Sequence, residues 1–224
     1  MHLRALGARA VSTRAGFAAR RLLFRGSARY WEHRYATGGS SGAGSSGAAA
    51  RWKADVVNAW VREHGVESVV DYGCGDGNQL ALAEYPRYLG LDSSPTAVRT
   101  CIARFRDDRT KSFLHYDPDV LSDPARWLSA DLALSMEVLF HLVEDDVFED
   151  YLRRLFGSAQ RFVAICSIDA SGGERSPHER YRLFTKWIQA NCPQWQLLQR
   201  VDPPHAVGLM SSLYLYARRP EAAE

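Results

Sequence analysis

The sequence predicts an α/β fold in which a doubly wound, mostly parallel sheet of seven strands ends in an antiparallel strand. Two observations support this prediction. From residue 52 onward, segments with helical periodicity alternate with short apolar runs that are typical of buried strands. Near the end of the chain, two strand-like segments, 195–201 and 211–219, follow each other without a helical segment between them. A chain of 224 residues has room for one such domain and a tail.

The first half of the domain carries a local signal for each element. Apolar residues recur with helical spacing over 51–65, and a β-branched run predicts a buried strand over 67–73. Ser94 followed by Pro95 is typical of a helix start, which places a helix over 94–105. The remaining segments of this half are predicted as a helix over 78–85 and strands over 87–92 and 111–117.

The second half repeats the alternation. The segment 144–157 is acidic at its start and basic in its last turn, the order of charges that the helix dipole favours. A second helix is predicted from residue 178, and Pro193 ends it. The remaining segments are predicted as strands over 131–137, 160–169, 195–201 and 211–219.

Composition excludes several classes of protein. Hydrophobic residues make up 46% and charged residues 24% of the chain, values that predict a buried globular core. No apolar run approaches the ~20 residues that a membrane-spanning helix needs. The four cysteines have no paired spacing, so we expect reduced thiols in a cytoplasmic protein rather than disulfides or a zinc site. They are Cys74, Cys101, Cys166 and Cys192.

The segment VVDYGCGDGN, residues 69–78, carries the clearest binding signal. Its three glycines follow a predicted strand, where they allow positive φ angles and close approach of a ligand to the backbone. A nicotinamide-dinucleotide fingerprint needs Gly or Ala at position 78, where this chain has Asn78. Asp71 before the turn is unfavourable beside a pyrophosphate but favourable beside a cationic amino group. The turn therefore predicts an amino-acid ligand rather than a dinucleotide.

Acids end three predicted strands, at Asp71, Asp92 and Asp117. In doubly wound sheets, ligands bind beyond the carboxyl ends of the strands. A carboxylate at Asp92 is placed to accept both hydroxyls of a ribose, and Asp117 to accept from an exocyclic amine. Together these residues predict a nucleoside that carries an α-amino acid, bound without phosphate contacts. That ligand is S-adenosylmethionine.

Residues 66–168 resemble class I S-adenosylmethionine-dependent methyltransferases, which have a Rossmann-like fold. Four segments in register carry the resemblance: VVDYGCGDG, YLGLDSSPTAV, FLHYDPDVL and ADLALSMEVLFHLVEDDVFEDYLRRLF. The alternative for each single position is a turn glycine or a helix-capping aspartate. The resemblance implies the following cofactor-binding residues: Asp71, Gly73, Gly75 and Asn78 at the methionine moiety, Asp92 and Ser93 at the ribose, Tyr116 and Asp117 at the adenine, and Ser135.

Two outer segments, YWEHRYATGGSSGAGSSG and SPHERYRLFTKWIQANCPQW, resemble small bacterial methyltransferases associated with sugar or polysaccharide modification. We divide the chain into a basic N-terminal extension over 1–37, a Gly/Ser hinge or lid segment over 38–50 and a class I methyltransferase domain over 51–219. Aromatic residues flank the Gly/Ser tract, so we interpret it as the hinge of a flap that closes over the cofactor. A plain flexible linker is the alternative.

The charge is unevenly distributed. Residues 1–35 contain eight arginines and one acid, Glu32, whereas the whole chain has a net charge of only +2. The remainder is therefore acidic, which does not favour nucleic acid as a partner. For the basic segment three interpretations stay open: a solvated tail, a contact with a membrane surface or a protein partner, and a mitochondrial transit peptide.

The segment after the fourth strand supplies candidates for the acceptor side. Glu137 and His141 lie four residues apart, and His178 follows later; these three are the candidate catalytic residues. They are also a candidate site for Mg²⁺ or Mn²⁺, because the segment resembles the E-x-x-E-H motif of small-RNA 2′-O-methyltransferases, with Phe140 in place of the second acid. Candidate substrate-binding residues are Arg180, Arg182 and Tyr35.

These observations predict an O-methyltransferase that acts on a hydroxyl of a small molecule, a sugar or glycan precursor. The segment SMEV replaces the N/D-P-P-Y/F tetrapeptide that is typical of amino-directed methyltransferases, which favours an oxygen acceptor. Two alternatives stay open: an RNA 2′-O-methyltransferase and a non-catalytic scaffold that binds the cofactor.

Overall fold

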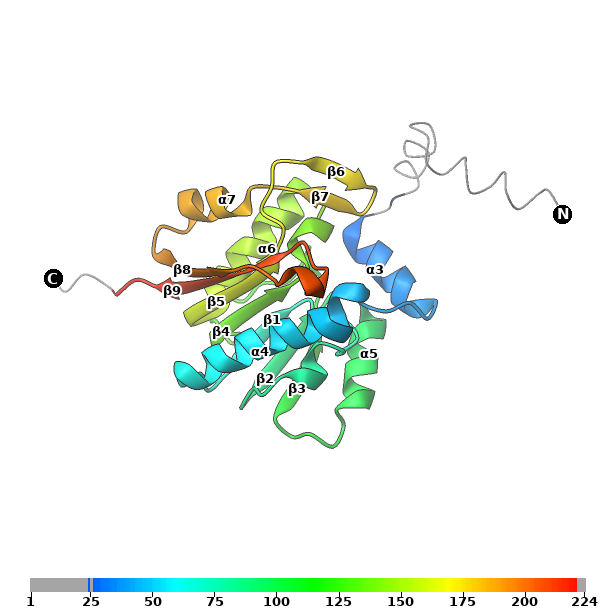
Figure 1. Cartoon of the computed structure of the whole chain (residues 1–224). Coiled ribbons are helices and arrows are strands. Elements are labelled where there is room, and N and C mark those ends of the chain that lie inside the picture. The colour runs from blue at the N-terminus through cyan, green and yellow to red at the C-terminus, as the bar shows by residue number, and fades with distance from the viewer. Residues whose placement is uncertain (1–23, 25, 221–224) are drawn as a thin grey trace.

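The computed structural model describes residues 24 and 26–220, and Figure 1 shows their arrangement around one central sheet. The sheet has seven strands in the order β3-β2-β1-β4-β5-β9-β8. Their bounds are β1 Val69–Tyr72, β2 Tyr88–Asp92, β3 Lys111–His115, β4 Ala130–Met136, β5 Ala159–Ser167, β8 Trp195–Val201 and β9 Ser212–Arg218.

Strand directions agree with the predicted fold class. Strand β1 pairs in parallel with both β2 and β4, so the chain order reverses at β1 and a switch point lies at its carboxyl end. Strand β9 runs antiparallel between β5 and β8. The prediction of a doubly wound sheet with an antiparallel last strand is therefore confirmed.

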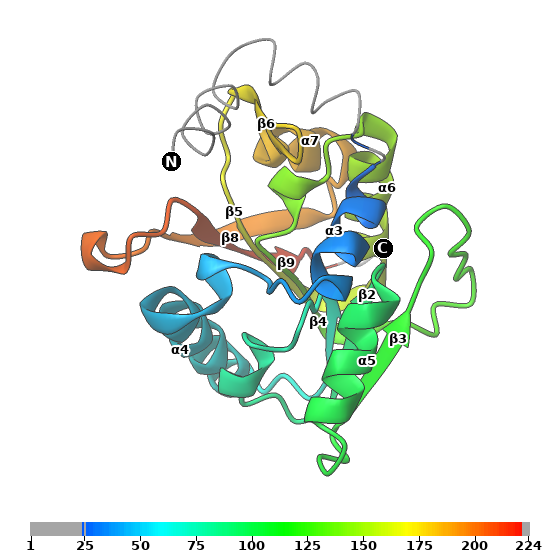
Figure 2. The same ribbon diagram turned by 90° about the vertical axis from the view of Figure 1, so that its right-hand side faces the viewer.

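Helices cover both faces of the sheet, as Figures 1 and 2 show. Helices α4 (Gly47–Glu63) and α5 (Pro95–Arg104) pack on one face, where Val57, Trp60 and Cys101 join one apolar cluster. Helices α6 (Asp145–Ser158) and α7 (Phe184–Asn191) pack on the other face. The predicted Ser94 cap of α5 is present, because its side chain accepts a hydrogen bond from the N–H of Ala97. The described helices include none that is long and apolar enough to cross a membrane.

Two predicted helices are wrong over part of their length. Over 78–85 only a 3₁₀ turn forms, η3 Leu80–Leu82. The Asn58 side chain donates to the carbonyl of Leu82 and accepts from the N–H of Glu84. These two hydrogen bonds occupy backbone groups that a longer helix would need for its own hydrogen bonds. Over 178–183 the chain instead forms strand β7 (Glu179–Tyr181), which pairs with β6 (Gly173–Ser176).

The Gly/Ser tract is more ordered than its composition indicates. It contains a 3₁₀ turn, η2 Ala43–Ser45, and its last four residues already belong to α4, because three alanines with high helix propensity follow Gly47. The N-terminal extension contains a helix, α3 Ser27–Ala36, which lies beside α5 in Figure 2. Most of the basic segment, residues 1–23 and 25, lies outside the described residues.

Candidate functional site

A large cavity lies at the carboxyl ends of β1, β2 and β4 and encloses about 1010 Å³ of empty space, counting its open mouth. Its floor is formed by residues at the strand ends, and residues from α3 and the Gly/Ser tract line its other side. This is the switch point at which doubly wound sheets bind ligands. Residues from α3 and the tract that line the cavity are Ser27, Ala28, Trp31, Tyr35, Ser41 and Ser45.

The glycine turn after β1 brings bare backbone to the cavity wall. Gly73 and Gly75 have φ angles of 88° and 58°, which side chains of L-residues rarely adopt. A Cβ atom at Gly73 would lie 2.5 Å from a methyl of Val138, and one at Gly75 would lie 2.4 Å from Oγ of Ser41. Only glycine therefore fits at both positions, and a ligand can approach the backbone closely there.

Two buried carboxyl groups line the cavity. Asp71 accepts a hydrogen bond from the hydroxyl of Tyr88 at 2.8 Å through Oδ2, while Oδ1 is buried without a hydrogen-bond partner among the described residues. Burial raises the pKa of Asp71 to about 7. Asp92 accepts from the N–H groups of Gly75 at 2.9 Å and Ser94 at 2.8 Å, and burial raises its pKa to about 6.

Two further polar side chains at this end were not predicted from the sequence. Lys53 is 1% exposed, and its Nζ is buried without a hydrogen-bond partner among the described residues. The charge of Lys53 lowers the pKa of Asp71, partly opposing the effect of burial. Gln79 lines the cavity and donates to the carbonyl of Ala50 at 3.0 Å, while its Oε1 is buried and unpartnered within the described structure. Both residues lie in segments with ordinary helical periodicity, so no pattern in the sequence indicates that they are buried.

Glu137 lines the cavity at the end of β4 with a strained backbone. Its φ angle is 64°, an uncommon value for a residue with a side chain, and such strain clusters at functional sites. Its N–H donates to the carbonyl of Cys166 at 2.9 Å, and the thiol of Cys166 lies 3.4 Å from Oε1. The strained turn directs the chain into η4 (Leu139–His141), which carries the second candidate from this segment.

His141 lines the cavity and is held from two sides. Its Nδ1 lies 3.0 Å from the carbonyl oxygen of His178, so Nδ1 donates the hydrogen bond. The ring of Trp31 meets the imidazole edge-on at a centroid distance of 4.8 Å. Burial lowers the pKa of His141 to about 4, so the side chain is neutral at pH 7 and Nε2 is a hydrogen-bond acceptor.

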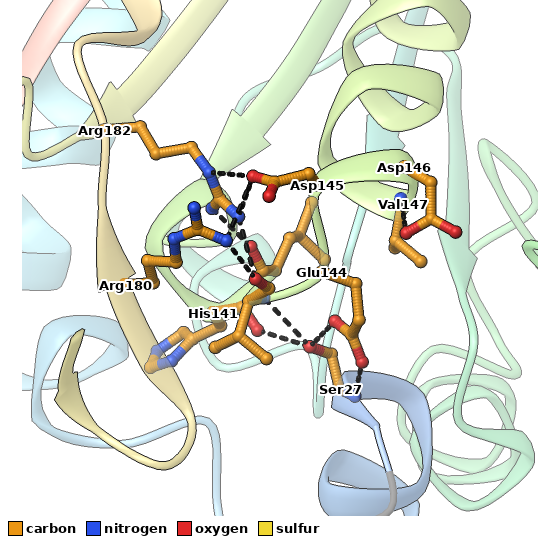
Figure 3. A network of polar contacts seen from close by, with 10 residues as sticks. Ser27, His141, Glu144, Asp145, Asp146, Val147, Arg180 and Arg182 are labelled. Atoms are coloured by element: carbon orange, nitrogen blue, oxygen red, sulfur yellow. Dashed lines mark hydrogen bonds and ion pairs between the residues drawn. The ribbon is translucent and has the colours of Figure 1, made fainter. Parts of the chain in front are cut away.

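Helix α3 is fixed over the cavity by polar contacts at two places. Near its start, Ser27 donates from its N–H and its hydroxyl to the carboxylate of Glu144, at 2.9 and 2.6 Å, as Figure 3 shows. In its middle, the carboxylate of Glu32 accepts from the hydroxyl of Ser94 and from the N–H and hydroxyl of Thr96 at the start of α5.

The Gly/Ser tract is attached as well. The N–H of Ser41 donates to the carboxylate of Asp76 at 2.9 Å, and the hydroxyl of Ser41 accepts from the N–H of Asp76 at 3.1 Å. The hydroxyls of Tyr35 and Ser41 lie 2.9 Å apart. Burial raises the pKa of Tyr35 further above the neutral range, so its hydroxyl stays protonated. The tract thus joins α3 to the glycine turn after β1.

Arg180 and Arg182, which were predicted to bind substrate, do not line the cavity. Both form ion pairs with Asp145 at 3.0 Å. They also donate to the carbonyl oxygen of Val143, and Arg182 donates to that of Leu142. In this arrangement they fix the segment between η4 and α6, which positions His141.

Four other predicted residues also lie outside the cavity wall. Asn78 donates to Asp76 and accepts from Arg104, so it stabilises the glycine turn. The hydroxyl of Ser135 accepts from Tyr151, and Asp117 is exposed to solvent. His178 contributes its carbonyl oxygen to His141, and its ring stacks on Tyr30. The predicted residues that do line the cavity are Asp71, Gly73, Gly75, Asp92, Ser93, Tyr116, Glu137, His141 and Tyr35.

The donor set does not fit the predicted metal site. No group of three His, Cys, Asp or Glu side chains that could hold an ion occurs within 26–220. The rings of His141 and His178 lie nearly parallel, with centroids 5.9 Å apart, and Nδ1 of His141 is engaged by a backbone carbonyl. Glu137, His141 and His178 are therefore not arranged as the predicted site for Mg²⁺ or Mn²⁺.

Comparison with known proteins identifies the type of domain. Residues 69–160 match the family of methyltransferase domains. The chain carries a methyltransferase domain. A small RNA 2′-O-methyltransferase from Arabidopsis thaliana is 31% identical over 100 residues, which are 40% of this chain and only 11% of the length of that curated relative.

Solved structures with the same fold cover more of the chain. Magnesium protoporphyrin IX methyltransferase from Synechocystis PCC 6803, solved with bound SAH, has a TM-score of 0.59 at 16% identity and covers 75% of this chain and 83% of its own. The methyltransferase domain of bacterial CtHen1-C has a TM-score of 0.59 at 20% identity and covers 76% of this chain and 98% of its own. The predicted class, S-adenosylmethionine-dependent methyltransferases with a class I fold, is confirmed.

Proposed function

We propose that this methyltransferase domain binds S-adenosylmethionine in the cavity and methylates a hydroxyl of a sugar-containing small molecule. One observation carries the cofactor assignment. Asp71 Oδ1 and Gln79 Oε1 are buried acceptors on the cavity wall without partners among the described residues. Buried polar atoms are normally hydrogen-bonded, so two orphaned acceptors beside a bare glycine backbone fit a ligand that carries an ammonium group.

The methionine end follows from these atoms. Asp71 Oδ1 and Gln79 Oε1 would accept hydrogen bonds from the α-ammonium group, and the backbone at Gly73 and Gly75 would lie against the ligand. Lys53 stabilises the ionised form of Asp71, which this contact requires. The cofactor, when bound, supplies a methyl group on a positively charged sulfur atom.

The nucleoside end is supported by residues from the next two strands. The two oxygens of Asp92 each accept a hydrogen bond from one backbone N–H. A carboxylate has capacity for further hydrogen bonds, so Asp92 can also accept from the hydroxyls of a ribose. Ser93 and Tyr116 line the same part of the wall, and Tyr116 is 9% exposed. We assign the adenine side to Tyr116 rather than to the exposed Asp117.

For the acceptor side we assign Glu137, His141 and Trp31, which share the cavity wall beyond the strand ends. A hydroxyl oxygen that gains a carbon substituent holds its proton far more weakly, so a base with a pKa of about 4 is strong enough to take it. His141 is neutral and offers Nε2 for that proton, which it releases to solvent at pH 7. The ring of Trp31 supplies an apolar surface beside these polar groups, as in many small-molecule sites.

The remaining parts of the chain complete the proposal. We assign the methyltransferase domain to 51–219 and treat 38–50, together with α3, as a lid over the cavity. The contacts of Ser27, Glu32 and Ser41 support this assignment, because they attach the lid to three different segments of the cavity rim. An enclosed site excludes water from the reacting groups.

RNA 2′-O-methylation is the second candidate. The 31% identity over 100 residues to a small RNA 2′-O-methyltransferase favours it. A ribose 2′-hydroxyl is itself a sugar hydroxyl, so Glu137 and His141 would play the same part. The two candidates differ in the rest of the substrate, since RNA binding depends steeply on salt.

Two measurements test the proposal. Calorimetry should detect S-adenosylhomocysteine binding that Asp71→Asn weakens, while the matched control Asp117→Asn, an exposed carboxyl outside the cavity, leaves it unchanged. Methyl transfer should then be screened by mass detection over free sugars, glycan precursors and short RNAs. Transfer to RNA alone, with binding that falls steeply with salt, would replace the small-molecule assignment. Equal binding by both variants would contradict the cofactor site.

A further inference from the structure

A second cavity lies on the α6 face of the sheet, apart from the proposed reaction site. It encloses about 1040 Å³ of empty space, counting its open mouth. The segment between β3 and β4, the last turns of α6, and the ends of the closing strands surround it. Four arginines and one acid supply its charged groups: Arg126, Arg153, Arg154, Arg218 and Asp123.

The acid does not balance the arginines. The carboxylate of Asp123 accepts from the N–H groups of Trp127 and Leu128, at 2.9 and 2.8 Å, and so closes its own loop. Arg153 is paired with Glu149 and Asp150 on the surface of α6. The other three arginines, Arg126, Arg154 and Arg218, form no ion pair with any described residue.

Two of these arginines, Arg126 and Arg218, are held in unfavourable states, the first in its backbone and the second in its side chain. Arg126 has a φ of 57°, a left-handed conformation that costs about 1 kcal/mol or more for such a residue. Its guanidinium donates to the carbonyl of Gly157 at 2.7 Å, near the end of α6. Nε of Arg218 is buried with no acceptor among the described residues, and its guanidinium lies over the ring of Trp195. The helix dipole offsets only about half a charge at this end.

We propose that this second cavity binds a phosphate or diphosphate group. Three arginines without carboxylate partners line it, and the planar donor fork of arginine matches phosphate oxygens in pairs. Gln194, also on the wall, adds an amide that can donate to the same oxygens. An anion there supplies the acceptor that buried Nε of Arg218 lacks.

The phosphate site borders the adenine end of the first cavity. Arg154 lines both cavities. Tyr72 lines the second cavity, and its ring meets Tyr116 and Tyr151 of the first edge-on, at 6.0 Å in each case. A ligand that fixes Tyr72 therefore acts on Tyr116, which we assign to the adenine of the cofactor, so phosphate and cofactor binding should be coupled reciprocally.

Calorimetry with sodium pyrophosphate tests the site in the full chain. Residues 1–35 are also basic, so the location depends on variants rather than on binding itself. Arg126→Asn keeps a residue that tolerates the left-handed backbone, and Arg154→Gln keeps the length of the side chain. Each should weaken pyrophosphate binding at least about tenfold. Arg106→Gln, which removes an exposed arginine paired with Asp107 outside the cavity, should change it less than about twofold.

Two results would overturn the assignment: no saturable binding of pyrophosphate by the unmodified protein, or equal affinity in Arg126→Asn, Arg154→Gln and Arg106→Gln. Sedimentation with phosphatidylcholine vesicles, with and without phosphatidic acid, identifies the source of the phosphate. Pelleting that the two cavity substitutions abolish assigns a lipid headgroup, and pyrophosphate binding without pelleting assigns a soluble phosphate compound. S-adenosylhomocysteine binding, measured in the same samples, reports separately on the proposed cofactor site.

Discussion

Replacing Asp71 by Asn should stabilise the ligand-free protein at high pH while it weakens cofactor binding. The pKa of Asp71 is raised from 3.8 to about 7, so the folded state holds a proton that the unfolded state has released between these values. The free energy of unfolding therefore falls as pH rises from about 4 to about 7. The full difference of about three pKa units corresponds to about 4 kcal/mol. Asn has no charge to desolvate and still accepts from Tyr88.

Urea unfolding of Asp71→Asn and of the unmodified protein, without ligand, measures this effect. From the two pKa values, the stability advantage of the variant should grow by about 2–3 kcal/mol between pH 5 and pH 8. Its weaker hydrogen bond to Tyr88 costs about 1 kcal/mol at both pH values and does not alter that change. A difference in stability that does not vary with pH, or a variant that is less stable at pH 8 than at pH 5 relative to the unmodified protein, would refute the reasoning.

Three further predictions concern other residues of the cavity. Asp92→Ala should weaken S-adenosylhomocysteine binding by about 1.5–3 kcal/mol in calorimetry, because it removes a charged acceptor; unchanged affinity would leave Asp92 as only a cap of the turn. His141→Ala should lower kcat about 10²–10⁴-fold with cofactor affinity retained, and the acid limb of the pH profile of the unmodified protein should lie near pH 4 rather than 6.5; near-normal turnover would remove His141 from the mechanism. Glu32→Gln should release α3 and lower kcat/KM more than it lowers Tm, with Glu63→Gln as a surface control; equal effects of the two substitutions would mean that α3 does not close the site.

The sheet was predictable because its signals are local. Apolar residues predominate in buried strands such as β1 and β4, and α5 carries its own cap at Ser94, so neither signal depends on distant contacts. The two incorrect helices failed for the opposite reason. At 78–85 the side chain of Asn58 takes backbone groups, and at 179–181 the chain pairs with β6, although both segments have helical periodicity. Tertiary contacts override local preference at these places.

The candidate site was predictable only where strand ends define it. Asp71 and Asp92 reach the cavity because parallel strands end at one edge of the sheet. Arg182 does not, since a nearby carboxylate and two carbonyls bind its guanidinium, and no spacing in the sequence indicates these partners. Lys53 could not be found either, because a lysine on a helix is normally exposed, and only packing shows this one to be buried.

Because α3 covers the cavity, ligands can enter when this helix moves, and the contacts of α3 determine the free-energy cost of that movement. Ser27 is the only buried residue of this helix, whereas α6 buries six, so α3 adds little to the apolar core. It is held by hydrogen bonds at two anchors and by the ring contacts of Tyr30 and Trp31 with the two histidines. The carboxylates of Glu32 and Glu144 together accept five hydrogen bonds from the rim and from Ser27. Hydrogen bonds to charged groups contribute about 1.5–3 kcal/mol each where water is excluded, but both carboxylates are only partly buried, so water replaces much of what they lose when α3 detaches. Opening should then cost only a few kcal/mol, less than the about 5–15 kcal/mol of global unfolding. We therefore expect α3 to detach while the sheet stays folded, which admits cofactor and acceptor to groups that the closed form keeps out of water.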